Sequence, residues 1–191
     1  MSPLEYNQSI VGDTVSLKEL IILPKQTFLK LNDEKKQRVE NALLNEFAHH
    51  PLNEAQVARI IKDASISRGA FYKYFDDLTD AYLYLLHQEL SHVHVNIENQ
   101  DYTDPQLIIR QMRRFIDEAH LLPSYSLFQM HFKYNENLLR PFIPTTEMKT
   151  TTWMYFILSH ETLRALFLDP DNQEFYFKRF KTAIAQIGKE Q

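Results

Sequence analysis

The chain has 191 residues, 44% of them hydrophobic, and a formal net charge of -4 at pH 7, which is enough apolar material for a small domain and a larger one. With three glycines and no cysteine, it offers no glycine-rich phosphate loop, disulfide or cysteine metal site. Strong helix formers in most segments predict an all-α protein. The sequence contains no run of about 18 apolar residues, so a membrane span is not expected. The lack of cysteine fits a cytoplasmic location.

The charge is distributed unevenly along the chain. Residues 25–75 hold nine Lys and Arg against six Asp and Glu, whereas residues 76–191 hold eleven against sixteen. A basic segment inside an acidic chain is typical of a protein in which one part contacts nucleic acid.

Residues 1–24 form a predicted N-terminal extension. They lack the basic region and the small-residue cleavage site of a secretory signal. Ser16–Ile22 could form one or two helical turns before Pro24 interrupts them. We expect a mobile, solvated tail; the alternative is an arm whose following lysines reach phosphate or the minor groove of DNA. Those lysines are Lys25, Lys30, Lys35 and Lys36.

The first long helix is predicted from Asn32 or Asp33 to His49, and Pro51 follows its end. Its apolar positions recur at helical spacing and face one side, which makes this helix a scaffold. The histidines at its end suit the negative end of the helix dipole, so a metal role is not expected there.

Two short helices across a tight turn are predicted between Asn53 and Phe75. The first is expected from Asn53, as N-cap, to Ala64. Ser67 is the residue type that caps a second helix, and Phe71 and Phe75 lie four residues apart, so both can face inward.

The outer face of the second short helix predicts contact with the major groove. Small residues let the backbone approach DNA, cationic side chains reach phosphate or guanine, and phenols donate to phosphate oxygens. The predicted DNA-binding residues are Ser67, Arg68, Gly69, Ala70, Tyr72, Lys73 and Tyr74, together with Lys35 from the first long helix.

The run S-I-S-R-G-A-F-Y-K-Y-F-D-D-L resembles the helix-turn-helix of TetR-family transcriptional regulators, and the resemblance covers Leu31 to about Leu86. Two positions depart from the family pattern. Ser65 stands where the family commonly has glycine in the turn, and Leu78 stands where it commonly has a lysine that reaches the phosphate backbone. A plain helical bundle is the alternative, because aromatic residues at helical spacing are more often core than function.

Five further helices are predicted after the short pair. The first begins at Leu78 or Thr79 and links the DNA-binding part to the rest of the chain. Proline positions and apolar spacing predict the others. Their expected ranges are 78–96, 105–120, 125–139, 146–168 and 172–187. The expected domains are therefore 25–77 for DNA binding and 78–191 for effector binding and dimerisation.

The last two helices carry broad apolar stripes that include Trp153, Phe156, Phe177 and Phe180. In the family that the chain resembles, such helices pair with their copies across a dimer. A homodimer also fits the physics, because one short recognition helix makes few base contacts and two of them read a palindromic operator. The alternative is that both stripes are buried within one chain.

Histidine spacing excludes a zinc site on one helix. His92 and His94 lie about 200° apart around a helix, and His87 and His94 are separated by roughly 10 Å along it. A zinc ion needs imidazole nitrogens about 2 Å away. Haem differs, because one axial ligand can come from each of two helices.

The stretch DDLTDAYLYLLHQELSHVH is similar to haem-responsive TetR-type regulators of lactic acid bacteria. That resemblance implies His94 as an axial ligand, with His131 or His160 opposite it. Haem as effector competes with a small hydrophobic effector and with no effector.

Three function classes follow from the sequence. A repressor released from its operator by a small effector is favoured. A DNA-binding structural or cell-division factor without an effector is second. An enzyme is not expected, because no triad, paired carboxylate or phosphate loop is present.

Overall fold

The computed structural model describes residues 24–93, 104–139 and 149–187, and every regular element among these residues is helical, as predicted. The helices are α1 (Gln26–Leu29), α2 (Asp33–His49), α3 (Val57–Asp63), α4 (Arg68–Tyr74), α5 (Leu78–Val93), α6 (Pro105–Ala119), α7 (Tyr125–Met130), α8 (Thr150–Leu168) and α9 (Gln173–Ile187). Short π- and 3-10 helices lie between them: η2 (His131–Asn135), η3 (Glu136–Leu138) and η4 (Pro170–Asn172).

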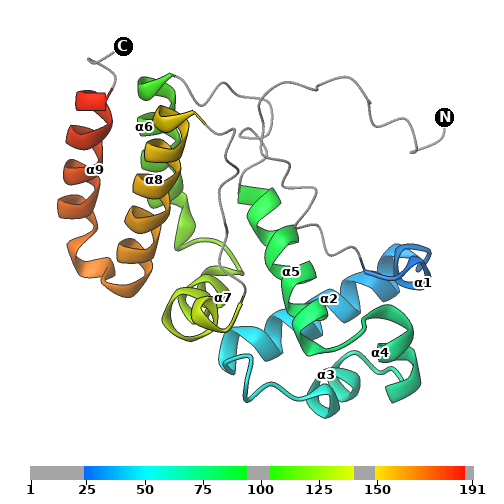
Figure 1. Ribbon diagram of the computed structural model, residues 1–191. Helices are drawn as coiled ribbons and strands as arrows, with labels where there is room; N and C mark the ends of the chain where they lie inside the picture. Colours follow the sequence, from blue (N-terminus) through cyan, green and yellow to red (C-terminus); the bar gives the residue numbers. More distant parts are fainter. Residues whose placement is uncertain (1–23, 94–103, 140–148, 188–191) are drawn as a thin grey trace.

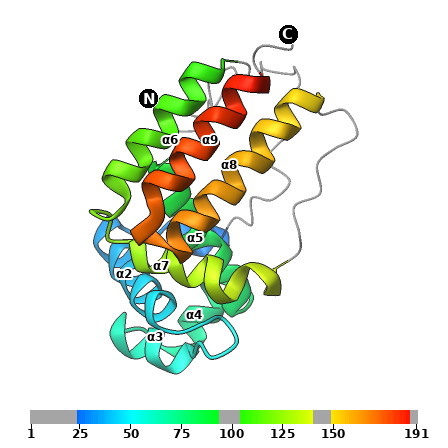
Figure 2. The same cartoon turned by 90° about the vertical axis from the view of Figure 1, so that its left-hand side faces the viewer.

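The helices form two groups that meet at α7. Helices α1 to α4 and the first half of α5 make a compact head, whereas α6, α8 and α9 run side by side in the other group (Figures 1 and 2). Helix α7 lies beneath these three helices and packs on α2 of the head. None of the described helices has the length and apolar character needed to cross a membrane.

Aromatic rings fill the core of the head. Phe28 lies 5.0 Å from Phe75 and 5.2 Å from Tyr84 between ring centroids, and Phe47 lies 5.1 Å from Tyr82. All five side chains are at most 3% exposed. This cluster continues into α7 and reaches Phe167 of α8. Packing therefore crosses the predicted boundary after residue 77, and that boundary stays a prediction.

A second apolar cluster lies among α6, α8 and α9. Its members come from all three helices, with Met112, Tyr155 and Ile184 at most 6% exposed. Asp104 caps α6 by accepting a hydrogen bond from the Gln106 N–H, and Pro105 occupies the first turn, as the sequence predicted.

The helices differ from the predicted ones at several points. The four-residue helix α1 was not expected. Helix α3 begins at Val57 instead of Asn53, because turns fold residues 51–55: the Glu54 and Ala55 N–H groups donate to the Pro51 and Leu52 carbonyls. The helix expected over 125–139 changes to π and then 3-10 geometry after Met130.

Other boundaries agree with the sequence. Asn32 caps α2 through its side chain, which accepts from the Lys35 N–H, and α2 ends at His49. The turns expected at Ser16–Ile22 and the predicted end of α5 near Asn96 lie outside the described residues. One start differs: α8 begins at Thr150 instead of near Thr146, because the backbone of Lys149 is not helical.

Candidate DNA-binding site

Helix α4 is anchored from below by two phenylalanines. Phe71 and Phe75 are fully buried and their ring centroids lie 5.6 Å apart, as their spacing predicted. The opposite side of α4 is open: Arg68, Tyr72 and Lys73 are all exposed. The structure thus brings a cationic, hydroxyl-bearing surface together on one short helix.

Ser67 fixes the first turn of α4. Its hydroxyl oxygen accepts a hydrogen bond of 3.1 Å from the Ala70 N–H, which confirms the predicted N-cap. A Cβ added at Gly69 would meet no heavy atom within 4 Å among the described residues. The space next to the Gly69 Cα is therefore open, and packing within the described residues does not require a glycine there.

Arg68 and Tyr72 form a pair on the exposed surface. The Arg68 guanidinium donates to the Tyr72 hydroxyl at 3.3 Å and lies 5.6 Å from the centre of the Tyr72 ring. Because the two residues are four positions apart, they are neighbours on one face of the helix. This contact orients the guanidinium before any DNA arrives.

Tyr74 does not lie on this surface. It is 5% exposed, and its ring packs 5.6 Å from Phe28 in the core. Its predicted role as an exposed phenol is therefore corrected, because position 74 faces the same side of the helix as Phe71. Lys35 lies in the first turn of α2 and stays a predicted contact outside the recognition helix. Leu78 is partly buried against the head core.

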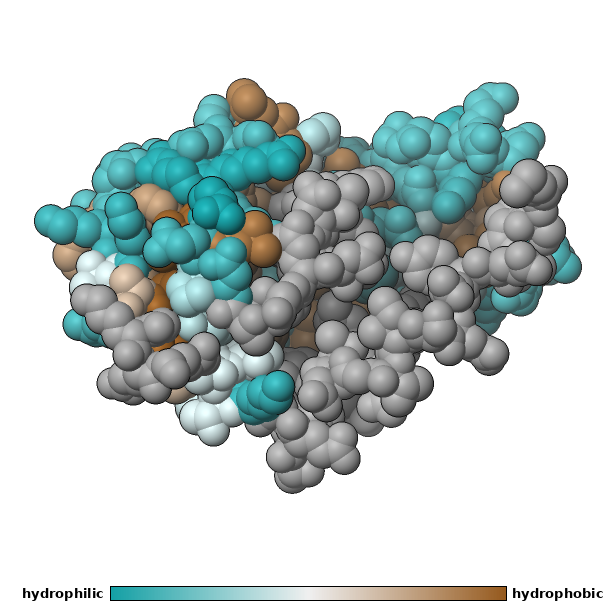
Figure 3. Space-filling model, turned by 90° about the horizontal axis from the view of Figure 1, so that it is seen from above, coloured by the Kyte–Doolittle hydropathy of each residue, from teal (hydrophilic) through white to brown (hydrophobic). Residues whose placement is uncertain are grey.

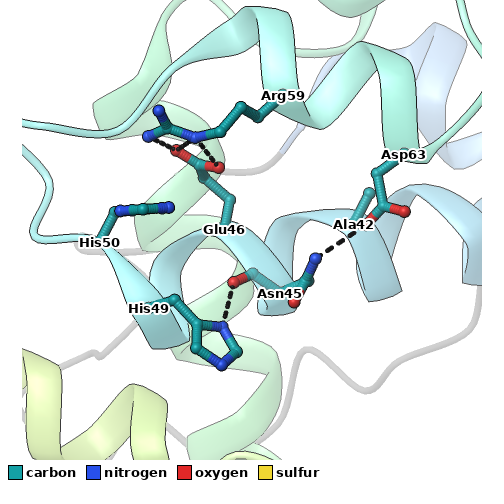
Figure 4. A pocket seen from close by; sticks show the side chains of 7 residues that line it. All are labelled: Ala42, Asn45, Glu46, His49, His50, Arg59 and Asp63. Carbon is teal, nitrogen blue, oxygen red and sulfur yellow. Dashed lines mark hydrogen bonds and ion pairs between the residues drawn. The ribbon is translucent and has the colours of Figure 1, made fainter.

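The angle between α2 and α3 is held by an ion pair between the buried Glu46 and the partly exposed Arg59. Glu46 of α2 is 4% exposed and accepts from the Arg59 guanidinium at 2.5 to 3.0 Å, and from the Gln56 N–H at 2.7 Å (Figure 4). Burial alone would raise the pKa of Glu46, but the hydrogen bonds from Arg59 and Gln56 outweigh it and lower the pKa. One carboxylate thus caps α3 and joins it to α2.

The turn between α3 and α4 is a complete Schellman motif. The Ile66 N–H donates to the Ile61 carbonyl at 3.0 Å, and the Ser65 N–H donates to the Lys62 carbonyl at 3.3 Å. Ser65 has φ = 53°, the left-handed region in which glycine is favoured. This explains physically why a glycine is common at that position in the family that the chain resembles.

Sequence reasoning missed two residues that contact α4. Lys25 and Thr27, at the start of α1, donate hydrogen bonds to backbone carbonyls at the C-terminal end of α4. Periodicity could not reveal a four-residue helix, and the contacts join positions 46 to 50 residues apart. The one available signal was a lysine and an apolar residue, Phe28, just ahead of the first long helix.

The candidate haem ligands occupy a different region. His94 lies outside the described residues. His131, in η2, accepts from or donates to the Tyr82 hydroxyl at 2.9 Å through Nδ1. His160, in α8, places Nε2 2.8 Å from Glu136. Groups of three or more potential metal ligands do not occur among the residues that the structure describes.

Burial determines the protonation of His131. It lowers the pKa of His131 to about 4, helped by the charge of His160, and it raises the pKa of Tyr82. The phenol therefore keeps its proton and the imidazole stays neutral at pH 7, so one of the two groups donates to the other according to the tautomer of His131. In the protonated imidazole, Nδ1–H donates to the Tyr82 oxygen.

Comparison with known proteins agrees with this geometry. Residues 41–78 match the family described as bacterial regulatory proteins, tetR family. A crystal structure of a TetR family transcriptional regulator from Chloroflexus aurantiacus J-10-FL is similar at a TM-score of 0.48 and 17% identity, covering 88% of this chain and 98% of that one. No curated protein sequence matches the chain. The family match spans the end of α2, all of α3 and α4, and the Glu46–Arg59 ion pair, so residues 41–78 match the DNA-binding helices of the tetR family.

Proposed function

We propose that the chain is a homodimeric repressor that binds a palindromic operator through α4 and is released from it by a small hydrophobic effector. The observation that carries the DNA contact is the exposed surface of α4, in which Arg68, Tyr72 and Lys73 surround the open backbone at Gly69. A basic, small and hydroxylated helix face suits the major groove.

Affinity for the operator tests this use of α4. Tyr72→Phe and Lys73→Ala should each weaken binding by roughly 1 to 3 kcal/mol without unfolding the protein, because both side chains are exposed. Lys181→Ala removes the same charge from an exposed position on α9 and is the control. Binding to the DNA upstream of the protein's own gene is measured by gel shift. Unchanged affinity in both head variants would mean that α4 does not enter the groove.

Gly69 provides a second test with opposite signs for folding and binding. Gly69→Ala should stabilise the protein by about 0.5 to 1 kcal/mol, because alanine favours the helix and its methyl group enters open space. The same methyl group should weaken operator binding if the α4 backbone approaches DNA closely. A variant that gains stability and binds DNA as tightly as the original would place Gly69 away from the groove.

The proposal of a homodimer rests on α8. Apolar residues occur on all its sides, and Trp153 and Ile157, four positions apart, are 43% and 38% exposed. A helix that is apolar all round is normally buried. Seen from above, brown apolar residues lie among teal ones on the side of the molecule where α6, α8 and α9 lie (Figure 3). A mass of 22.7 kDa by light scattering at micromolar concentration would contradict the dimer.

The proposed small effector needs a pocket in which to bind. Two hollows formed by described residues have volumes of about 200 Å³, next to Glu46 and Arg59, and about 160 Å³, next to Phe115 and Tyr125. Both are smaller than the roughly 300 Å³ of a typical ligand pocket. The second candidate is a DNA-binding factor of the same fold without an effector. Release of operator DNA by any small molecule would decide for the first.

Haem as effector would use His94 as one axial ligand and His131 or His160 as the other. The Phe132 ring contacts both imidazoles, with centroids 5.1 Å and 5.8 Å away, and both imidazoles already contact other side chains. Haem as effector therefore stays a proposal that depends on His94. Haemin titration of the His94→Ala variant should show no haem absorption band and full operator binding that haemin does not release, with His120→Ala as control. A retained band would exclude His94 as the ligand.

A further inference from the structure

Helix α1 lies against the recognition helix. The Phe28 ring is fully buried between Tyr74, at the end of α4, and Phe75, with centroid distances of 5.6 and 5.0 Å. This buried ring holds α1 in place, so that the polar residues before it, Lys25 and Thr27, reach the C-terminal end of α4.

All four carbonyls at the end of α4 accept hydrogen bonds. The last four carbonyls of a helix have no partner within the helix and need other donors. Here the Phe71 carbonyl accepts from the Phe75 N–H, and the Tyr74 carbonyl accepts from the Lys25 N–H, each at 2.9 Å. The Tyr72 carbonyl accepts from Lys25 Nζ at 3.0 Å, and the Lys73 carbonyl accepts from Thr27 Oγ1. Three of the four donors come from α1 and the residue before it.

The charge of Lys25 suits this position. The C-terminal end of a helix carries partial negative charge, so an ammonium group is stabilised there. Lys25 Nζ also lies 2.5 Å from the Asp76 carboxylate, although Asp76 is 78% exposed and the pair therefore contributes little to stability. The ammonium group is thus directed at protein carbonyls and a protein carboxylate.

A helix as short as α4 depends on such contacts. Isolated helices of fewer than about 12 residues are marginal in water, and α4 has 7 residues. Ser67 caps its first turn, and α1 supplies the donors for its last turn. The exposed residues Tyr72 and Lys73 belong to that last turn, so their backbone position follows from the contacts of their own carbonyls.

We propose that Lys25 and Thr27 are positioning residues for operator recognition: they hold the last turn of α4, and with it Tyr72 and Lys73, in the orientation that fits the groove. The proposal rests on the proposed use of α4 in DNA binding. The competing role for Lys25 is a direct contact with a DNA phosphate, which would make the lysine part of the interface.

Three variants separate the two roles. Thr27→Val removes the hydroxyl at nearly constant volume, Thr27→Ser keeps it, and Lys25→Met removes the ammonium while retaining the backbone N–H that donates to Tyr74. Lys181→Met removes an exposed lysine from α9, outside the head, and is the charge control. Each variant is assayed for operator affinity across a range of salt concentrations, and for hydrogen exchange of the amides in residues 71–75.

Positioning predicts a specific set of results. Thr27→Val and Lys25→Met should each weaken operator binding about fivefold to tenfold and should speed amide exchange in α4, because each removes a hydrogen bond from the helix end. Thr27→Ser should restore both properties. The slope of log affinity against log salt should stay unchanged in Lys25→Met, because no phosphate contact is lost.

Two outcomes would overturn the proposal. A salt slope that falls by about 1 in Lys25→Met, with α4 exchange unchanged, would assign Lys25 to a phosphate contact instead. Operator affinity unchanged in Thr27→Val, while Tyr72→Phe and Lys73→Ala still weaken binding, would show that α4 binds DNA without help from α1. If Lys25→Met, Thr27→Val, Tyr72→Phe and Lys73→Ala all bind the operator normally, the proposed use of α4 itself is wrong.

Discussion

The head and the C-terminal helices differ in how completely each buries its aromatic side chains. In the head, the rings of Phe28, Phe71 and Phe75 are fully enclosed within one chain. On α8 and α9, Trp153 and Phe175 are 43% and 61% exposed. The head is therefore complete as a single copy, whereas the C-terminal helices present apolar surface that a second copy would cover. Variants in each region should respond differently to protein concentration.

Phe75→Ala should have the largest effect. The side chain is fully buried and contacts Phe28, Phe71 and Tyr84, so its removal should lower the free energy of unfolding by about 3 to 5 kcal/mol. Because all these contacts lie within one chain, urea unfolding monitored by circular dichroism should show the same loss at every protein concentration. Phe175→Ala, on the exposed part of α9, is the matched control. An equal loss in both variants would remove the distinction between the two regions.

The contact between the two regions includes a partly buried polar cluster, and pH should test it. Tyr82 of α5 bonds His131 of η2, and the Asn135 side chain, in η2, accepts from the Leu52 N–H of the head at 2.8 Å. His160 and Glu136 face this cluster from α8 and η3. These contacts place an unprotonated imidazole at the junction between the head and the C-terminal helices.

The sign follows from where the proton binds first. Below its ordinary pKa of 6.5 the unfolded chain protonates His131, whereas the folded chain does so only near its pKa of about 4. The free energy of unfolding should therefore fall as the pH is lowered from about 6.5 to about 4, by an amount on the order of 3 kcal/mol. His131→Gln should flatten this dependence, while His120→Gln, at an exposed position, should leave it unchanged. Urea unfolding at pH 7 and pH 4.5 measures the difference, and equal slopes in all three proteins would contradict it.

Trp153→Ala should reveal the proposed dimer surface. Buried tryptophans at the centre of an interface commonly contribute about 2 kcal/mol or more to binding. The variant should raise the dimer dissociation constant, measured by analytical ultracentrifugation, and its stability should depend on concentration less steeply than that of the original protein. Arg110→Ala, at an exposed polar position on α6, serves as the control. If Trp153→Ala has the same dissociation constant as the original protein, the interface lies elsewhere.

Local patterns predicted the parts of this fold that depend on local interactions. The start of α2 near Asn32, the cap at Ser67 and the inward positions of Phe71 and Phe75 were predicted because cap type and helical period are short-range properties. The start of α3 was predicted wrongly, because the cap that forms uses Glu46, ten positions before Gln56.

Long-range contacts explain what the sequence could not predict. Helix α1 exists because its donors meet carbonyls of α4, and no periodicity records that pairing. Tyr74 has the same residue type as the exposed Tyr72, and only the helix phase relative to Phe28 places it in the core. The predicted residues that are exposed form a narrower set than residue type alone suggested: Ser67, Arg68, Gly69, Tyr72 and Lys73.

Ser65→Gly should have the smallest effect on the free energy of unfolding, and it should raise that free energy instead of lowering it. Its φ of 53° costs an L-residue about 1 to 2 kcal/mol relative to the right-handed region, and glycine avoids that cost. Glycine also loses more backbone entropy on folding, by about 0.5 to 1 kcal/mol. The difference predicts that Ser65→Gly stabilises the protein by about 0.5 kcal/mol, since both hydrogen bonds of the turn use backbone groups and survive the change.

The matched variant Ser65→Val should act in the other direction, because a β-branched side chain fits the left-handed region poorly. Thermal unfolding should therefore give midpoints in the order Val, Ser and Gly at position 65, from lowest to highest. Operator affinity should not rise with stability in this series, because the Schellman turn already places α4 in the same geometry in all three proteins. If Ser65→Gly is no more stable than the original protein, the serine side chain makes a compensating contact within the protein. The left-handed backbone at position 65 would then not lower the stability of the head.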